Sequence, residues 1–170
     1  SEIWSLGLGA WGLLAADRLD EAEAWLRDCL ERIDTLHWVA FRPWPIALLG
    51  EARLRQQDKP APLRAALEEG FALSCQLRDP CWEAANARSL ALTYMAEREF
   101  VAASQWLEEA DRRCIRVTDP YVALRVEIVA ARVEMSRRLD IPEVAAALTR
   151  EWISLAARAH MDHHLPRATA

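Results

Sequence analysis

Apolar residues recur at three- and four-residue intervals along two long stretches of the chain, residues 80–96 and 120–136. This spacing matches the turn of an α-helix, so each stretch is predicted to be a helix with apolar faces. Each begins with an Asp-Pro step, at 79–80 and at 119–120. Aspartate is a favoured N-cap, and proline suits the first helical position because no N–H is needed there. The two steps therefore predict two helix starts, forty residues apart.

Each of these helices is followed by a short polar turn and a second helical pattern, at 101–117 and at 143–159. Similar segments occur upstream, at 14–33 and 62–73. The chain is thus expected to form one all-α domain over 1–170, with helix–turn–helix hairpins at about 1–36, 41–77, 80–117 and 120–160. One hairpin cannot bury both faces of its helices, so the four are expected to stack as a right-handed α-solenoid. The first helix of each hairpin then lines the concave side.

Charge and hydropathy along the chain limit the kinds of molecule that this protein is expected to contact. A net charge of −5 and a pI near 5.4 argue against a general polyanion-binding surface, so we expect no direct nucleic-acid contact. No run of 18 apolar residues occurs and the N-terminus lacks a basic leader, so neither a membrane span nor a signal peptide is expected and the location is predicted to be cytoplasmic. The four cysteines form no CxxC pair and are expected to be buried apolar side chains.

The third hairpin resembles the tetratricopeptide (TPR) repeat. Its first helix carries Leu90, Ala91 and Tyr94, and its second carries the alanine, bulky apolar, alanine series Ala103, Leu107 and Ala110. The first hairpin keeps the second half of this pattern, through Ala22, Leu26 and Cys29. The repeat is near 40 residues, longer than the usual 34. The resemblance implies a degenerate TPR-like array over essentially the whole chain.

The tail "WISLAARAHMDHHLPRATA" (152–170) is similar to segments late in the helical-repeat region of LuxR-type and SARP-type bacterial regulators. In those proteins such hairpins follow a signal-transduction ATPase core. This resemblance implies a sensor or partner-binding array without catalytic residues of its own. The apolar helices expected at both ends also suggest a piece of a longer array, because solenoids usually end in polar capping helices.

Polar residues of the first helices are the candidate ligand-binding groups. Arg88, Arg125 and Arg132 are predicted to point into one channel, with Asn86 and Glu51 nearby. Clustered guanidinium groups would favour a carboxylate or phosphate partner. The alternative is that these arginines are solvated, or paired with glutamates of their own helices.

Aromatic residues form a second candidate set. Trp82 and Tyr121 stand near the starts of two first helices, so they are predicted to line one rim of the groove, where aromatics would anchor a peptide or a sugar. Trp25, Trp106 and Trp152 lie beside the apolar positions of second helices and are expected to fill space between hairpins. Trp4 and Trp11 are seven apart and so share nearly one helix face.

Catalytic and metal chemistry are not indicated. The segment "HMDHH" (160–164) could gather a metal ion, but no second pair of ligands is obvious and a polar terminal turn is the favoured interpretation. The chain has neither a GxxxxGK[ST] loop nor a G-x-S-x-G turn. We therefore expect no enzyme activity, no cofactor and no metal.

Two functions remain at this stage. The favoured one is a non-catalytic binding module, the regulatory array of a bacterial signalling ATPase or transcription regulator. The alternative is an independent scaffold that assembles a complex through its groove. The partner would be a protein, a peptide or a small effector such as an oligosaccharide, and exposed terminal helices could form a homodimer.

Overall fold

A computed structural model describes residues 2–116 and 122–169, and all regular structure in these ranges is helical. The all-α prediction is confirmed for this part of the chain. The second Asp-Pro step, at 119–120, and Tyr121 lie outside the described residues. The α-helices are α1 (Glu2–Ala15), α2 (Leu19–Thr35), α3 (Pro43–Arg55), α4 (Pro60–Leu77), α5 (Pro80–Ala96), α6 (Phe100–Cys114), α7 (Val122–Arg138), α8 (Pro142–Arg158) and α9 (Leu165–Thr169), and two 3-10 helices are η1 (Val39–Phe41) and η2 (Asp162–His164).

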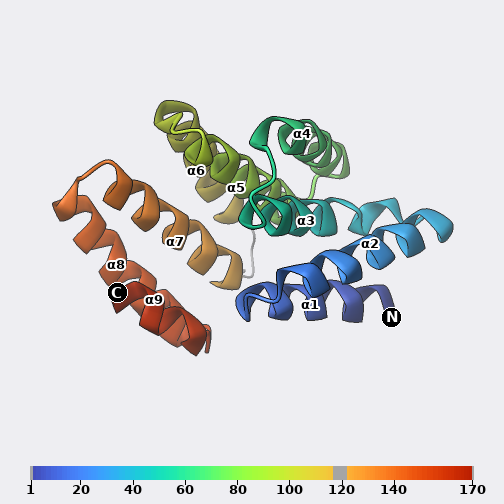
Figure 1. Ribbon diagram of the computed structural model, residues 1–170, viewed down its shortest axis with the longest axis horizontal. Helices are drawn as coiled ribbons and strands as arrows, with labels where there is room; N and C mark the ends of the chain where they lie inside the picture. Colours follow the sequence, from blue (N-terminus) through green and yellow to red (C-terminus); the bar gives the residue numbers. More distant parts are fainter. Residues whose placement is uncertain (1, 117–121, 170) are drawn as a thin grey trace.

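Each helix from α1 to α8 packs against the next one along the chain (Figure 1). Following the predicted hairpins, α1–α2, α3–α4, α5–α6 and α7–α8 are called pairs here, each with a first and a second helix. The first helices also contact one another in order, α1 with α3, α3 with α5 and α5 with α7. The short helix α9 folds back onto α8. Four first helices thus lie along one side of the protein.

The turns between helices repeat one backbone geometry at nearly regular intervals. A non-glycine residue with positive φ follows the end of seven helices, at Asp17, His37, Gln57, Arg78, Arg98, Asp140 and His160. In each, the N–H of this residue and the N–H of the next bond to carbonyls of the last helical turn, as at Arg98 to Met95 and Glu99 to Tyr94. This is the Schellman arrangement, which satisfies the free carbonyls of a helix end.

Capping residues in the sequence also mark several helix starts. Asp79 caps α5, because its carboxylate accepts from the backbone N–H groups of Cys81 and Trp82 at 3.0 and 3.2 Å. Prolines occupy the first turn of α3, α4, α5 and α8. The structure therefore confirms the Asp79-Pro80 step as a helix start.

The core takes apolar positions from both the first and the second helices, and nearly the whole circumference of α5 is buried. The aligned residues of α2, α4 and α6 are buried: Ala22, Leu26, Cys29, Leu63, Leu67, Gly70, Ala103, Leu107 and Ala110. Trp152 is buried as well, and Trp106 is partly buried. Trp25 is 43% exposed, contrary to the expectation that it fills space between hairpins, because it lies over the surface of α1 at Gly9.

Among the described helices, none has both the length and the apolar character needed to span a membrane.

Candidate functional site

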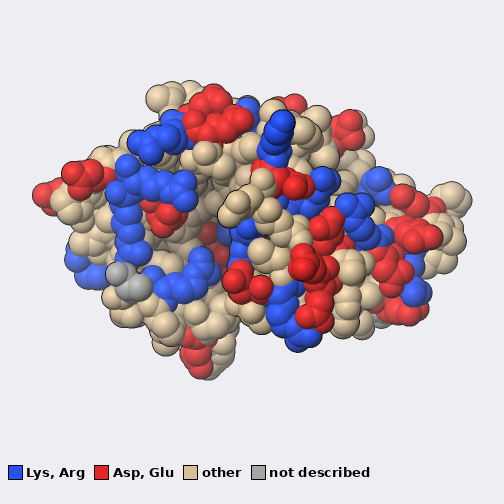
Figure 2. All heavy atoms as spheres, viewed as in Figure 1, with Lys and Arg blue, Asp and Glu red and all other residues tan. Residues whose placement is uncertain are grey.

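A groove of about 700 Å³ runs along the side formed by the first helices. Residues of α1, α3, α5 and α7 line it, and Trp152, His163 and Arg167 close it at the C-terminal end. Figure 2 shows the surface hollowed here, with basic side chains around part of the rim. Its apolar lining includes Trp11, Leu54, Leu92, Met95 and Val133. The groove therefore offers apolar surface and charge together.

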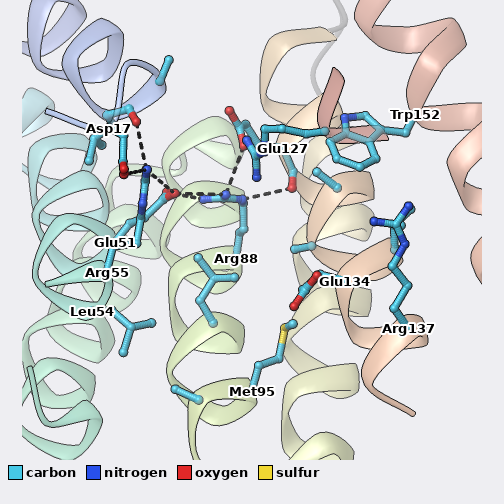
Figure 3. Close-up of a pocket in the computed structure, with 18 of the residues that line it drawn as sticks. Asp17, Glu51, Leu54, Arg55, Arg88, Met95, Glu127, Glu134, Arg137 and Trp152 are labelled. Atoms are coloured by element: carbon cyan, nitrogen blue, oxygen red, sulfur yellow. Dashed lines mark hydrogen bonds and ion pairs between the residues drawn. The ribbon is translucent and has the colours of Figure 1, made fainter. Parts of the chain in front are cut away.

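Arg88 of α5 lies at the centre of the groove floor, 8% exposed, between two carboxylates (Figure 3). Its Nη1 donates to Glu51 Oε2 of α3 at 2.6 Å, and its Nη2 to Glu127 Oε2 of α7 at 3.1 Å. Its Nε donates to the backbone oxygen of Glu127, also at 3.1 Å. A single guanidinium thus joins three successive first helices.

The pKa values follow from this pairing. Burial opposes the charged form of Arg88, but the charges of Glu51 and Glu127 outweigh it and raise the pKa of Arg88 above its usual range. Burial alone would raise the pKa of Glu127. The charge of Arg88 and the hydrogen bond from His164 outweigh burial and hold the pKa of Glu127 well below its usual range. Arg88 and Glu127 are therefore charged at neutral pH, and the charge of Arg88 is compensated by the carboxylates on either side of it.

His164 continues this network beneath the groove, where it is fully buried. The indole Nε1 of Trp152 donates to His164 Nδ1 at 3.2 Å, and His164 Nε2 lies 3.1 Å from Glu127 Oε1. Because the indole can only donate, Nδ1 must accept, which leaves the ring proton on Nε2, where it is donated to Glu127. The contacts thus assign Nδ1 of His164 as an acceptor and Nε2 as a donor.

On the other side the network reaches α1. Arg55 Nη2 lies 2.7 Å from Asp17 Oδ1, and its Nη1 lies 3.8 Å from Glu51 Oε1. One continuous series of polar contacts therefore crosses the groove floor from the first helix pair to the fourth: Asp17, Arg55, Glu51, Arg88, Glu127, His164 and Trp152.

Glu127, His163 and His164 place one potential metal-ligand atom each within 4.8 Å of the others. The hydrogen bonds oppose a metal ion at this cluster. Nε2 of His164 carries the proton that the Trp152 contact imposes, so its lone pair is not available, and Glu127 is already held by Arg88. The sequence offers both histidines only as possible ligands, with a polar terminal turn favoured, and does not point to Glu127, which is 36 positions from the nearer one.

The cysteine thiols are not activated. Cys29 and Cys114 are buried, and Cys75 and Cys81 are partly buried. Burial raises the pKa of Cys29 and of Cys81 to about 11, with a further contribution from a neighbouring aspartate in each case. These two thiols are therefore protonated at neutral pH, whereas nucleophilic cysteines have lowered pKa values.

Of the three arginines that the sequence groups together, only Arg88 lines the groove. Arg125 is paired with Glu151 of α8 at 3.2 Å, and Arg132 lies 4.0 Å from Asp111 of α6. The two are seven residues apart and both turn towards second helices. The structure thus corrects the expected channel of three guanidinium groups, since Arg88 is neutralised and the other two are directed elsewhere.

Asn86 and Trp82 belong to the core of the second and third pairs. Asn86 is fully buried and donates to the backbone oxygens of Pro43 and Trp82, both at 3.0 Å. Trp82 is 8% exposed and stacks on Trp44, with ring centroids 5.3 Å apart. Neither lines the groove, which differs from the expected rim position of Trp82. Tyr121, the other predicted rim residue, lies outside the described residues.

Sequence reasoning missed the C-terminal wall of the groove. The sequence predicts a polar terminal turn at 160–164, whereas the structure folds residues 162–169 back so that His163 and Arg167 face the groove beside Trp152. The buried His164 gives no sign of its position in the sequence, because its partners Glu127 and Trp152 are 37 and 12 residues away.

The described residues thus define an all-α protein with a mixed apolar and charged groove. No protein-family model, curated protein or solved structure matches this chain.

Proposed function

We propose that this chain is a non-catalytic binding module, a right-handed α-solenoid of four TPR-like helix pairs whose concave groove holds a protein segment or a small effector. The observation that carries the proposal is the groove of about 700 Å³, to which the first helix of every pair contributes. Ligand sites are typically concave and largely apolar with a few placed polar groups. The apolar residues of α3, α5 and α7 around the charged floor fit this description.

The charged groups of the floor support binding rather than catalysis. Arg88 is paired with both Glu51 and Glu127, and the ring proton of His164 is committed to Glu127. A general base needs a free lone pair within reach of its substrate, and the groups in this network are already engaged.

The three methionines allow a direct test. Met95 lines the groove, whereas Met135 and Met161 do not. Spectra of the chain labelled with ¹³C at the methionine methyl groups would be recorded with mixtures of random peptides and of small-molecule fragments. The expected result is a set of binders that shift the Met95 signal more than the other two. If the binders move Met135 or Met161 and leave Met95 unchanged, the groove is not the site.

A pair of variants provides the control. Ala96 is exposed at the groove edge of α5, and Ala65 is exposed on α4, away from the groove. Ala96→Trp is expected to weaken binding by filling the groove, and Ala65→Trp adds the same side chain without effect. Equal effects of the two substitutions would contradict the proposal.

The parent of the module is a separate part of the proposal, which rests on the resemblance of the tail 152–170 to LuxR-type and SARP-type regulators. We infer that the array regulates an attached bacterial signalling ATPase. Sequencing the gene upstream of residue 1 tests this. A Walker-type ATPase on the same chain supports it, and a start codon directly before Ser1 would instead favour an independent scaffold.

A further inference from the structure

Positive charge without a carboxylate partner gathers at the C-terminal wall of the groove. Each of the four groove-lining carboxylates is paired with an arginine: Asp17 with Arg55, Glu51 and Glu127 with Arg88, and Glu134 with Arg138. Two further arginines line the groove, Arg137 of α7 and Arg167 of α9. Within residues 2–116 and 122–169, neither forms an ion pair with a carboxylate.

Both side chains are nevertheless positioned by the fold. Arg137 donates from Nη2 to the backbone oxygen of Ala168 at 3.3 Å, which brings it beside α9. The guanidinium of Arg167 lies 5.8 Å from the ring centroid of Trp152. Figure 3 shows Arg137 on the same side of the groove as Trp152. Most of the N–H donors of these two arginines therefore remain for a ligand, since a guanidinium carries five.

The neighbouring groups do not cancel this charge. Burial lowers the pKa of His163, and the charge of Arg167 acts in the same direction, which favours a neutral ring. Glu127, the carboxylate that groups with His163 and His164, is paired with Arg88 and His164, and the charge of Arg167 also contributes to lowering its pKa. Among the described groove residues, five arginines stand against four carboxylates, so an incoming anion would meet an excess of positive charge beside the two guanidinium groups that form no ion pair.

The rest of the groove would accommodate the apolar part of a ligand. Leu54, Leu92 and Met95 line the part of the groove contributed by α3 and α5. Burying apolar surface there contributes roughly 25 cal/mol per Å² to binding, whereas the guanidinium groups orient a charged head.

From this arrangement we propose that the groove binds a small organic anion, with its carboxylate or phosphate on Arg137 and Arg167 and its apolar part against α3 and α5. This deepens the proposed function, on which it rests, by naming the class of ligand. It also moves the anion site away from the arginines at 88, 125 and 132, whose charge the protein itself neutralises.

The test uses three probes that share one apolar chain: octanoate, octyl phosphate and uncharged 1-octanol, each below the concentration at which it aggregates. Dissociation constants are measured by calorimetry, and the Met95 methyl signal reports entry into the groove. At least one of the anions is expected to bind about tenfold more tightly than octanol, as charge-assisted hydrogen bonds allow. The comparison of octanoate with octyl phosphate identifies the preferred head group.

The double variant Arg137→Gln/Arg167→Gln is expected to lose this preference and to bind anion and alcohol within about twofold of each other. The matched control is Arg27→Gln/Arg112→Gln, which removes two well-exposed arginines from α2 and α6, outside the groove, and should keep the preference. An unchanged preference in the groove variant overturns the proposal.

The outcomes distinguish a failure of the anion site from a failure of the groove as a binding site. If octanol and both anions shift Met95 equally and bind with equal affinity, the anion site is wrong and the groove remains a binding site. If no probe, peptide or fragment shifts Met95, the proposed function itself fails, and with it the inference that rests on it.

Discussion

At the scale of single residues, Arg88 shows how a side chain that looks like a ligand-binding group can serve the fold. The sequence places an arginine on a helix face predicted to be concave, and the structure places two glutamates from neighbouring helices against it. Removing one partner of a buried ion pair is costly, because the remaining charges lose their compensation. Arg88 is therefore expected to matter first for stability.

Arg88→Met should lower the free energy of unfolding by about 3–5 kcal/mol at neutral pH, because Glu51 and Glu127 would lose the cation that lies between them. The loss should shrink in acid. Arg88 lowers the folded-state pKa of Glu127, so its stabilising effect is present above the unfolded-state pKa of about 4.3 and is lost as the pH falls below it. Urea unfolding at a series of pH values measures both effects.

Arg112→Met is the control for this variant, because the side chain of Arg112 is 71% exposed and pairs with Glu109 on the surface of α6. Its expected effect is below about 1 kcal/mol at any pH. A similar loss for both variants, or a loss for Arg88→Met that grows in acid, would contradict the role assigned to Arg88.

At the scale of helices, starts and ends differ in how clearly the sequence marks them. Asp79 and Pro80 mark a start that the structure confirms. The ends are not marked by glycine, the residue most common there: the chain has five glycines, and the seven positive-φ positions are occupied by other residues. Helix ends are therefore set by tertiary packing and turn geometry as well as by local preference.

Asp79→Ala should cost about 1 kcal/mol of stability, because two N–H groups of the first turn of α5 lose their acceptor. Asp58→Ala is the matched control. Asp58 also lies shortly before a proline-led helix, but its carboxylate pairs with Arg53 at 2.8 Å and caps nothing in α4. The control should cost less than about 0.5 kcal/mol in thermal or urea unfolding. Equal costs would show that the cap contributes nothing of its own.

At the scale of the whole molecule, the first and the fourth helix pairs are linked. Trp11 of α1 packs against the cluster that contains Trp44 and also against the cluster of α7 and α8 that contains Trp152. In an open array each repeat contacts only its neighbours. Here the polar series along the groove floor extends from the first helix pair to the fourth, and the indole of Trp11 contacts clusters of both. The two end pairs are therefore in contact, which the repeat pattern of the sequence does not imply.

Trp11→Ala should therefore increase amide hydrogen exchange in α7 and α8 by about tenfold or more, although the substitution lies on α1. Trp4→Ala is the control on the same helix, because Trp4 contacts Phe41 and Trp44, near the first two pairs. It should affect exchange in α1 and α3 but not specifically in α7 and α8. The same exchange pattern in both variants would mean that Trp11 does not link the two ends.

The sequence by itself determined the helical class and the buried faces of the second helices. These features depend on local helix preferences and on an apolar period of three to four residues, both of which can be recognised in a single sequence. Leu26, Leu67 and Leu107 are buried as their spacing predicts. The groove was expected on the side of the first helices, and residues of α1, α3, α5 and α7 line it.

Only the tertiary structure decided which charges of the groove are free. Arg88 meets Glu51 and Glu127 at separations of 37 and 39 residues, and Arg167 reaches Trp152 because α9 folds back onto α8. Helix periodicity tells which face a side chain occupies but not which distant side chain meets it there. Since pairing decides whether an arginine stabilises the fold or remains available to a ligand, the anion site could be inferred only once the helices were placed in space.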